Sequence, residues 1–310
     1  MAGGNPLSGE PGEVADSLCL HADPAGCIER VPITMCEQRD QVQRAAEELL
    51  SEVVVALDEL LASLEQLDLA QHAFSQFQKT ALASLGRAWD TAESIRLLVR
   101  AGHGAQAAVL LRTLFDLYVS LSYIDRTDSE ARAERYIAYD DVLAHKRSGT
   151  IRELAQGGDV GAKQSLAGNA ARDQEIEKGY EAFRARYECE RGNWKGAHWS
   201  GLDTRTLCKE LCLLGYYAAI YQRSSLDIHS AARSLSGQLS HSGSGTTACI
   251  KLKRGCDDSE LTYVLFSAPA LAIRVVCLCA KALAISDDRM SAFAFLAKRH
   301  SSLFGESTRI

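Results

Sequence analysis

The sequence predicts an all-α protein, a multi-helix bundle with loop insertions. Apolar residues recur at three- and four-residue steps over most of the chain after Glu37, the period of a helix with one buried face. The chain has only five prolines, and all but Pro269 precede residue 33, so the body contains few helix breakers. Only one short stretch, Cys249 to Lys253, alternates as a small strand or hairpin arm does.

The composition is that of an ordinary globular protein. Hydrophobic residues make up 46% of the chain and charged residues 24%, which allows a core of useful size. The net charge of −6 gives no support for a broad nucleic-acid-binding surface, although a local basic patch remains open. We find no signal peptide, and charged residues interrupt the most apolar stretches, 105–124 and 268–284. We therefore expect a cytoplasmic protein without membrane spans, in which the ten cysteines are reduced.

Residues 1–36 predict an irregular, poorly ordered leader, because they are rich in glycine and proline and lack helical periodicity. The leader contains four potential zinc ligands: Cys19, His21, Cys27 and Cys36. Their spacing lacks the close pairs of structural zinc sites, so the sequence leaves open whether they bind a metal. We predict no metal site and no cofactor elsewhere. Residues 37–310 are predicted to form a single helical domain.

The first half of this domain is predicted to contain four helices joined by short turns. Their ranges are about 37–66, 70–101, 105–124 and 128–148. The first two are expected to form an antiparallel hairpin. Asp128 and the acidic residue that follows it are a typical helix start.

The second half alternates helices with longer loops. Residues 155–170 are Gly-rich and polar and predict an exposed loop, which a charged helix follows over about 172–190. A loop with several glycines then carries Trp194 and Trp199, which either clamp it onto the bundle or wall a pocket. Asp203 or Thr204 is expected to cap a helix that continues to His229. Two C-terminal helices are predicted over about 267–286 and 288–304, and Pro269 lies in the first turn of the former.

Four cysteines lie among apolar residues at helical positions: Cys208, Cys212, Cys277 and Cys279. They are expected to be buried as small hydrophobic residues. Cys208 and Cys212 are one helical turn apart, but no matching histidine pair lies nearby to complete a metal site.

The segment from Tyr217 to His229 carries the best candidate site. Tyr221, Ser225 and His229 recur at four-residue steps and so share one face of a helix. The neighbouring residues are apolar, and a polar row that is partly buried must be hydrogen-bonded or functional. His229 is either a structural donor or a general acid/base. A Ser-His-Asp triad is not indicated, because Asp227 points elsewhere on the helix.

Arg112 and Asp116 are a second polar feature, one turn apart inside a very apolar helix. Such charges need partners. Two interpretations remain open. They are an intrahelical ion pair that ties helices together, or a guanidinium that Asp116 holds and aims into a pocket for an anion such as phosphate.

At these residues the chain resembles a bacterial family catalogued as domain of unknown function 5677. The resemblance covers about residues 70–235 and the helix after Pro269. It rests on four segments: Leu110 to Asp116, Arg135-Tyr136-Ile-Ala-Tyr139, Trp199-Ser-Gly-Leu202 and Tyr217 to His229. The family commonly has glutamate where Asp116 stands. The resemblance implies a helical fold and groups Arg112, Asp116, Tyr136, Trp199, Tyr221 and Ser225 around one pocket.

A second resemblance is to helical ribonucleases of the HEPN type, whose signature is an arginine, four to six residues and then a histidine. Arg223 and His229 have five residues between them. In that family the pair acts on an RNA backbone without a metal, usually across a homodimer interface. The resemblance implies catalytic roles for Arg223 and His229, although on an ideal helix these two lie on different faces.

Two classes of function therefore remain. The first is a pocket protein that binds RNA, a nucleotide or phosphate, and that acts as a metal-independent ribonuclease if it is an enzyme. The second is a non-catalytic interaction module with a protein partner, of the defence or toxin–antitoxin kind. In the second case the polar row is a buried network that fixes the register of the helices.

Overall fold

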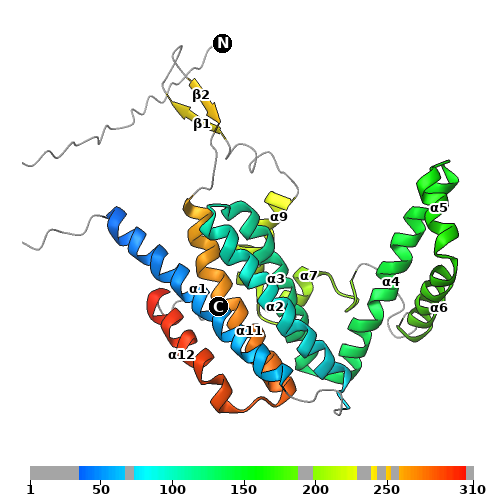
Figure 1. The fold of residues 1–310 in the computed structure, drawn as a ribbon, viewed down its shortest axis with the longest axis horizontal. Helices are drawn as coiled ribbons and strands as arrows, with labels where there is room; N and C mark the ends of the chain where they lie inside the picture. The colour runs from blue at the N-terminus through cyan, green and yellow to red at the C-terminus, as the bar shows by residue number, and fades with distance from the viewer. Residues whose placement is uncertain are drawn as a thin grey trace, which may run out of the picture.

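The structure is a computed structural model that describes residues 35–66, 73–187, 198–228, 239–242, 249–252 and 258–304. The fold of these residues is all-α, as predicted (Figure 1). The helices are α1 (Met35–Glu65), α2 (Gln76–Arg100), α3 (Gly104–Arg126), α4 (Ser129–Gln156), α5 (Val160–Gly168), α6 (Ala170–Tyr187), α7 (Thr204–Glu210), α8 (Leu214–Tyr216), the π-helix η2 (Tyr217–Gln222), α9 (Arg223–Ile228), α11 (Asp258–Leu283) and α12 (Asp287–Phe304). The alternating stretch forms strand β2 (Cys249–Leu252), which pairs antiparallel with β1 (Leu239–Ser242), so the predicted hairpin is confirmed.

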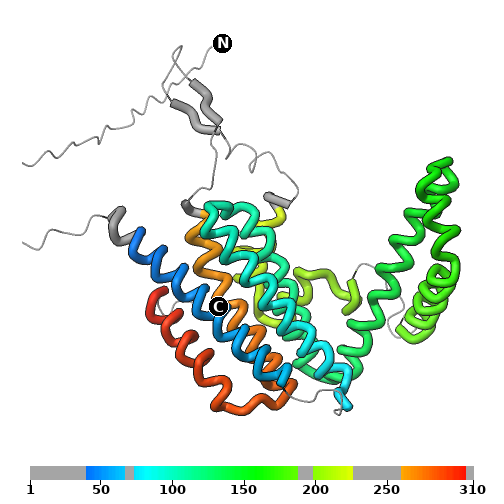
Figure 2. Tube along the Cα trace, in the orientation of Figure 1, coloured from blue at the N-terminus to red at the C-terminus, as the bar shows by residue number. Residues whose placement is uncertain are grey.

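The core lies between α1, α2, α3 and α11, which run side by side in the bundle, with α12 packed on α1 and α11 (Figures 1 and 2). Its largest fully buried side chains include Leu50 of α1, Ile95 of α2 and Phe115 of α3. Both α3 and the part of α11 from Glu260 on are long and apolar enough to span a membrane by composition. More than half of each apolar window is buried within the bundle, as in the core helix of a soluble protein.

The start of α4 is tied to the start of α2. Ser75 caps α2 through a capping box with Gln78. The carboxylate of Glu130, in the first turn of α4, accepts hydrogen bonds from the backbone N–H groups of Gln76 (2.6 Å) and Phe77 (3.0 Å). These amides have no partner within their own helix, so a carboxylate from another helix is a favourable cap. The contact fixes where α4 leaves the bundle.

Helices α4, α5 and α6 form an arm that projects from the bundle (Figure 1). The prediction of an exposed loop over 155–170 is wrong, because α4 continues to Gln156 and α5 occupies much of that stretch. Gly158 has a φ of 99°, which turns the chain, and Asp159 then accepts a hydrogen bond from Ala162 N (2.7 Å) to cap α5. The glycines therefore mark a turn between two helices.

The prediction that a helix begins at Ser267 is also wrong, because α11 begins at Asp258 and contains Pro269 in its interior. A proline there leaves the carbonyl four residues earlier without its usual partner and disturbs the helix. The carbonyl of Phe266 accepts a hydrogen bond from Nε2 of His300 at 2.8 Å. Because His300 belongs to α12, this bond joins the two C-terminal helices at the proline.

The single helix expected from Asp203 to His229 is broken. Asp203 does cap its first part, accepting from Thr206 N at 2.9 Å. That part ends at Glu210, after which Cys212 has a φ of 59° and the chain continues through η2. Cys212 is therefore exposed and not buried as expected, and so is Cys277 on the outer face of α11. Cys208 and Cys279 are buried, as predicted.

Several predictions concern residues outside the described ranges. These are the leader with Cys19, His21 and Cys27, the loop residue Trp194, and His229. Cys36 lies in the first turn of α1. The single-domain organisation of 37–310 stays a prediction.

Candidate functional site

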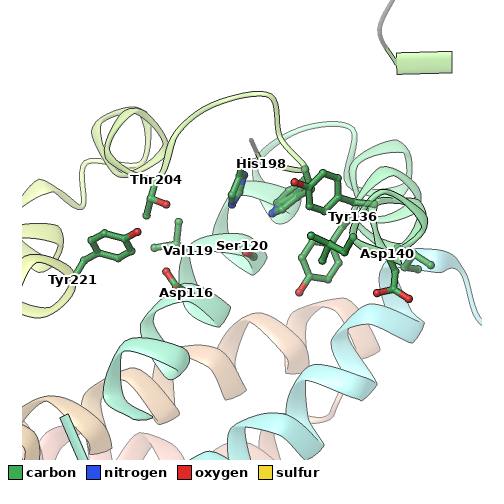
Figure 3. A pocket seen from close by; sticks show the side chains of 12 residues that line it. Asp116, Val119, Ser120, Tyr136, Asp140, His198, Thr204 and Tyr221 are labelled. Carbon is green, nitrogen blue, oxygen red and sulfur yellow. The ribbon is translucent and has the colours of Figure 1, made fainter. Parts of the chain in front are cut away.

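A pocket of about 530 Å³ opens between α3, α4, the residues before α7 and the π-helix η2. Figure 3 shows Asp116, Val119 and Ser120 of α3 close to His198 and Thr204, with Tyr221 at one end and Asp140 at the other. Twelve residues line it: Asp116, Val119, Ser120, Tyr136, Ile137, Tyr139, Asp140, Leu143, His198, Trp199, Thr204 and Tyr221. The pocket thus combines aromatic rings with carboxyl, hydroxyl and imidazole groups, and its volume is typical of a small-molecule site.

Asp116 is a carboxyl group of this pocket whose pKa is strongly shifted. It stands on α3, an otherwise apolar helix, and its side chain is 47% exposed. Burial of the carboxyl by the surrounding protein raises its pKa to about 6, while the positive charge of Arg112 opposes that rise. The carboxyl therefore changes protonation close to neutral pH, unlike an ordinary aspartate.

Arg112 lies behind Asp116 and is held from three sides. Its Nη1 donates to Oγ of Ser225 at 3.0 Å, and its Nε lies 3.8 Å from a carboxyl oxygen of Asp116. Its Cζ lies 3.9 Å from the centre of the Tyr221 ring, a cation–π contact. The structure thus brings together four of the predicted residues, Arg112, Asp116, Tyr221 and Ser225. This geometry is that of an ion pair within α3 that also ties α3 to η2 and α9, and Arg112 is not among the residues that line the pocket, so the anion-binding interpretation stays a prediction.

The π-helix η2 carries Tyr221 to this position. Its ring stacks on Tyr217 at 5.0 Å, and the Tyr221 carbonyl accepts a hydrogen bond from Oγ of Ser225 at 2.6 Å. Ser225 therefore links Tyr221 to Arg112, because its hydroxyl donates to the Tyr221 carbonyl and accepts from the Arg112 guanidinium. Short π segments inside helices recur at functional sites, where the wider turn re-aims side chains.

Trp199 and Tyr136 form the aromatic wall. Their ring centres are 5.1 Å apart and their ring planes are nearly perpendicular. Tyr123 of α3 also packs against Trp199, with 5.6 Å between the ring centres. Trp199 is 4% exposed, and its indole Nε1 has no hydrogen-bond partner within the described ranges. Burial, with the nearby charge of Asp116 as a lesser cause, raises the pKa of the Tyr136 hydroxyl. Trp199 both anchors its loop and walls the pocket, so the two roles considered for it coexist.

His198 is a pocket residue that the sequence analysis did not single out. Its Nδ1 lies 2.8 Å from Oγ and 3.3 Å from the backbone nitrogen of Ser200, so the residues of its own loop hold the imidazole ring in place. Burial lowers the pKa of His198, and Asp203 opposes that change. Ser120, Asp140 and Thr204 were missed as well. The available signal was a histidine directly before Trp199, in a loop already singled out for its tryptophans.

Arg112 and Ser225 contact the pocket residues Asp116 and Tyr221 but do not line the pocket themselves. Arg223 lies with its Cζ 4.5 Å from the ring centre of Tyr263, on the side of α11. It does not line the pocket of Asp116. His229 lies outside the described residues. The catalytic pair of the HEPN-type interpretation therefore stays a prediction.

We also searched the described residues for side chains that could together hold a metal ion. Among the described residues no group of three or more His, Cys, Asp or Glu side chains is arranged to hold a metal ion. Asp116 and His198 instead stand beside aromatic rings, an arrangement suited to a planar ligand with polar edges.

A family model described as "Family of unknown function (DUF5677)" matches residues 78–246, more than half of the chain. The matched segment includes Arg112, Asp116, Tyr136, Trp199 and Tyr221, so the pocket lies within it. No curated protein and no solved structure matches the chain.

Proposed function

The chain belongs to the DUF5677 family, and from the geometry of its pocket we propose that it binds the base of a nucleotide or of single-stranded RNA. The observation that carries this proposal is the carboxyl of Asp116, half exposed in a cavity whose walls include Tyr136, Trp199 and Tyr221. Aromatic side chains can stack on any base, because every base has a π-face. A carboxylate adds selectivity by accepting hydrogen bonds from base N–H groups.

The charge of the pocket favours a base over a phosphate. Two of its lining residues, Asp116 and Asp140, are carboxylic acids, which repel a phosphate when they are ionised. Arg112, the cation expected to bind an anion, is already engaged by Ser225, Asp116 and the Tyr221 ring. A base with two adjacent N–H donors, as guanine presents, matches the two oxygens of a carboxylate.

Hydroxyl groups and His198 complete the recognition of such a ligand. Ser120 and Thr204 each offer a donor and an acceptor in the pocket. Because its pKa is raised to about 6, Asp116 is also the group suited to exchanging a proton with a ligand near neutral pH. In this proposal the protein acts in the cytoplasm, where nucleotides and RNA are found.

Isothermal titration calorimetry with guanosine, inosine and ribose 5-phosphate tests the proposal. We expect guanosine to bind, inosine to bind more weakly because it lacks the amino group, and ribose 5-phosphate not to bind. Asp116→Asn should weaken guanosine binding about tenfold or more, since a hydrogen bond to a charged group is lost. Asp90→Asn is the matched control, because Asp90 is exposed on α2, away from the pocket. Equal binding by Asp116→Asn, or binding of ribose 5-phosphate alone, would contradict the proposal.

The non-catalytic interaction module is the competing proposal. The full engagement of Arg112 and the projecting arm of α4, α5 and α6 favour it. Absence of binding by any nucleoside, together with a loss of stability on Arg112→Leu, would support this alternative. RNA cleavage that His229→Ala abolishes at an unchanged Tm would instead support the HEPN-type interpretation.

A further inference from the structure

A second pocket, of about 250 Å³, lies where α8, α11 and α12 meet, and it shares no lining residue with the pocket of Asp116. Its polar side chains are those of Tyr216, Ser267, Arg274, Cys277, His300 and Ser301. Among the residues that the structure describes, no aspartate or glutamate lines it. The pocket therefore has one permanent positive charge, that of Arg274. The hydroxyl, thiol and imidazole groups and the tyrosine ring around it carry no fixed charge.

Arg274 is the centre of this pocket. It stands on α11, whose neighbouring residues Ile273 and Val275 are buried in the core. Its guanidinium lies 5.5 Å from the ring centre of Tyr216 and 6.0 Å from that of Tyr118. Within the part of the chain that the structure describes, Arg274 has no carboxylate in ion-pair contact. A guanidinium has five N–H donors and is always charged, so beyond its interaction with Tyr216 it keeps donors that an anion could accept from.

The neighbours of Arg274 are affected by its charge. Burial lowers the pKa of His300, and the nearby Arg274 lowers it further. Burial raises the pKa of the Cys277 thiol, and Arg274 opposes that rise by favouring the thiolate. Both effects are those of a positive potential inside the pocket. A bound anion would experience the same potential as an attraction.

We propose that this pocket binds a small oxyanion, a phosphate or a carboxylate, with Arg274 as its counter-charge. The rings of Tyr216 and Tyr118 position the guanidinium, and the hydroxyls of Ser267 and Ser301 supply further donors. Arg–phosphate and Arg–carboxylate pairs are frequently bidentate, which suits a planar guanidinium held against aromatic rings. The site is independent of base binding at Asp116, because the two pockets have separate walls.

Cys277 is a native reporter for this site, because it is exposed and lines the pocket. The purified full chain is alkylated with iodoacetamide in the presence and absence of inorganic phosphate, at constant ionic strength set with sodium chloride. Tandem mass spectrometry follows Cys277 separately from Cys212, an exposed thiol outside the pocket. At a phosphate concentration about ten times the Kd, we expect Cys277 to react about tenfold more slowly, because only the free protein reacts. The rate at Cys212 should not change.

Two variants and a second anion complete the test. Arg274→Gln should abolish the protection of Cys277, whereas Arg289→Gln, an exposed position on α12 outside the pocket, should leave it intact. Acetate in place of phosphate shows whether a carboxylate is accepted, and protection by either anion supports the site. Alkylation of Cys277 that neither anion slows in the wild-type chain overturns the proposal, whether or not Arg274→Gln folds. Protection that persists in a folded Arg274→Gln overturns it as well.

Discussion

Asp116 lies where folding disfavours the ionised form of a carboxyl group. Its pKa is about 6 in the folded protein, against about 3.9 for an aspartate in an unfolded chain. Between these two values the folded state binds more protons than the unfolded state, so Asp116 lowers the stability of the fold as the pH rises through that window. At pH values above this window, Asp116 is ionised and lowers the free energy of unfolding by its full amount.

Replacing this carboxyl by an amide should therefore stabilise the protein at neutral pH. We expect Asp116→Asn to raise the Tm at pH 7.5, and the difference from wild type to shrink as the pH falls from about 6 towards about 4, where the wild-type carboxyl is protonated. Differential scanning calorimetry over this range measures the effect. A Tm difference that does not depend on pH would show that the carboxyl is not perturbed as described.

Ser225 and Ser224 are adjacent residues with opposite roles. The Ser225 hydroxyl accepts from Arg112 and donates to the Tyr221 carbonyl, whereas Ser224 is fully buried and its Oγ has no hydrogen-bond partner in the part of the chain that the structure describes. We expect Ser225→Ala to lower the free energy of unfolding by about 1 to 2 kcal/mol, because a bond to a charged group is lost. Ser224→Ala is the matched control and should change it little. Urea denaturation compares the two, and equal losses would argue against a specific role for Ser225.

At this scale the sequence predicts which side chains meet better than it predicts the pocket. The four-residue step predicts that Tyr221 and Ser225 share a face, and in the structure both contact Arg112, a neighbour that the family resemblance supplied and the spacing did not. His198 and Asp140 were missed because they enter the pocket from a loop and from the arm, and no spacing within one helix reveals that. Helical periodicity reports the faces of one element, and pockets form between elements.

Among the elements, the close packing of α4 and α6 depends on a glycine. A Cβ atom on Gly179 of α6 would lie 2.5 Å from the carboxyl carbon of Asp141 on α4, whereas a Cβ on Gly149 of α4 would meet nothing within 4 Å. The arm therefore offers one helical glycine at which a Cβ would displace the Asp141 carboxyl and one at which a Cβ would meet nothing.

Alanine at these two positions should give opposite results. We expect Gly149→Ala to stabilise the protein by about 0.5 to 1 kcal/mol, because alanine loses less backbone entropy in a helix. Gly179→Ala should destabilise it, and adding Asp141→Ala should restore much of the loss by removing the clash. Thermal unfolding of the single variants and the double variant decides the matter. Equal stabilisation by both alanines would contradict the close approach of the helices.

The elements that the sequence mispredicted share a physical cause. Residues 155–170 have the composition of a loop, yet Asp159 caps a helix after the Gly157-Gly158 turn. Pro269 usually marks a helix start, but here α11 extends before it, and the His300 side chain bonds the neighbouring Phe266 carbonyl. At 155–170, a helix cap outweighs the loop-like composition. At Pro269, a tertiary contact accompanies a helix that continues through the proline. Helices α1 and α3 were predicted to within a few residues, whereas α4 extends to Gln156, beyond its predicted end near residue 148.

The described part of the molecule consists of a bundle core and a projecting arm formed by α4, α5 and α6 (Figure 1). Helices α2, α3 and α11 contact one another extensively, and the pocket of Asp116 lies where α3 meets the base of the arm and η2. The fold class follows from helical periodicity over most of the chain after Glu37. The arrangement of the arm depends on contacts such as that of Glu130 with the start of α2, which no single segment encodes.

Hydrogen exchange should reflect this organisation. We expect the slowest amide exchange in α2, α3 and α11, because opening them exposes the core, and much faster exchange in α5, where only Ala162 is buried. Mass spectrometry of peptic fragments measures both. Protection of α5 equal to that of α3 would mean that the arm opens only together with the bundle.

The central claim is that Asp116 is a titratable group in a pocket that binds a base. A ¹³C NMR titration of the aspartate carboxyl carbons, assigned by comparison with Asp116→Asn, tests it most directly. We predict a pKa of about 6 for Asp116 in the free protein. That pKa should fall when guanosine is present, because N–H donors stabilise the ionised carboxyl. A pKa near the ordinary value of about 3.9, unchanged by guanosine, would contradict the account.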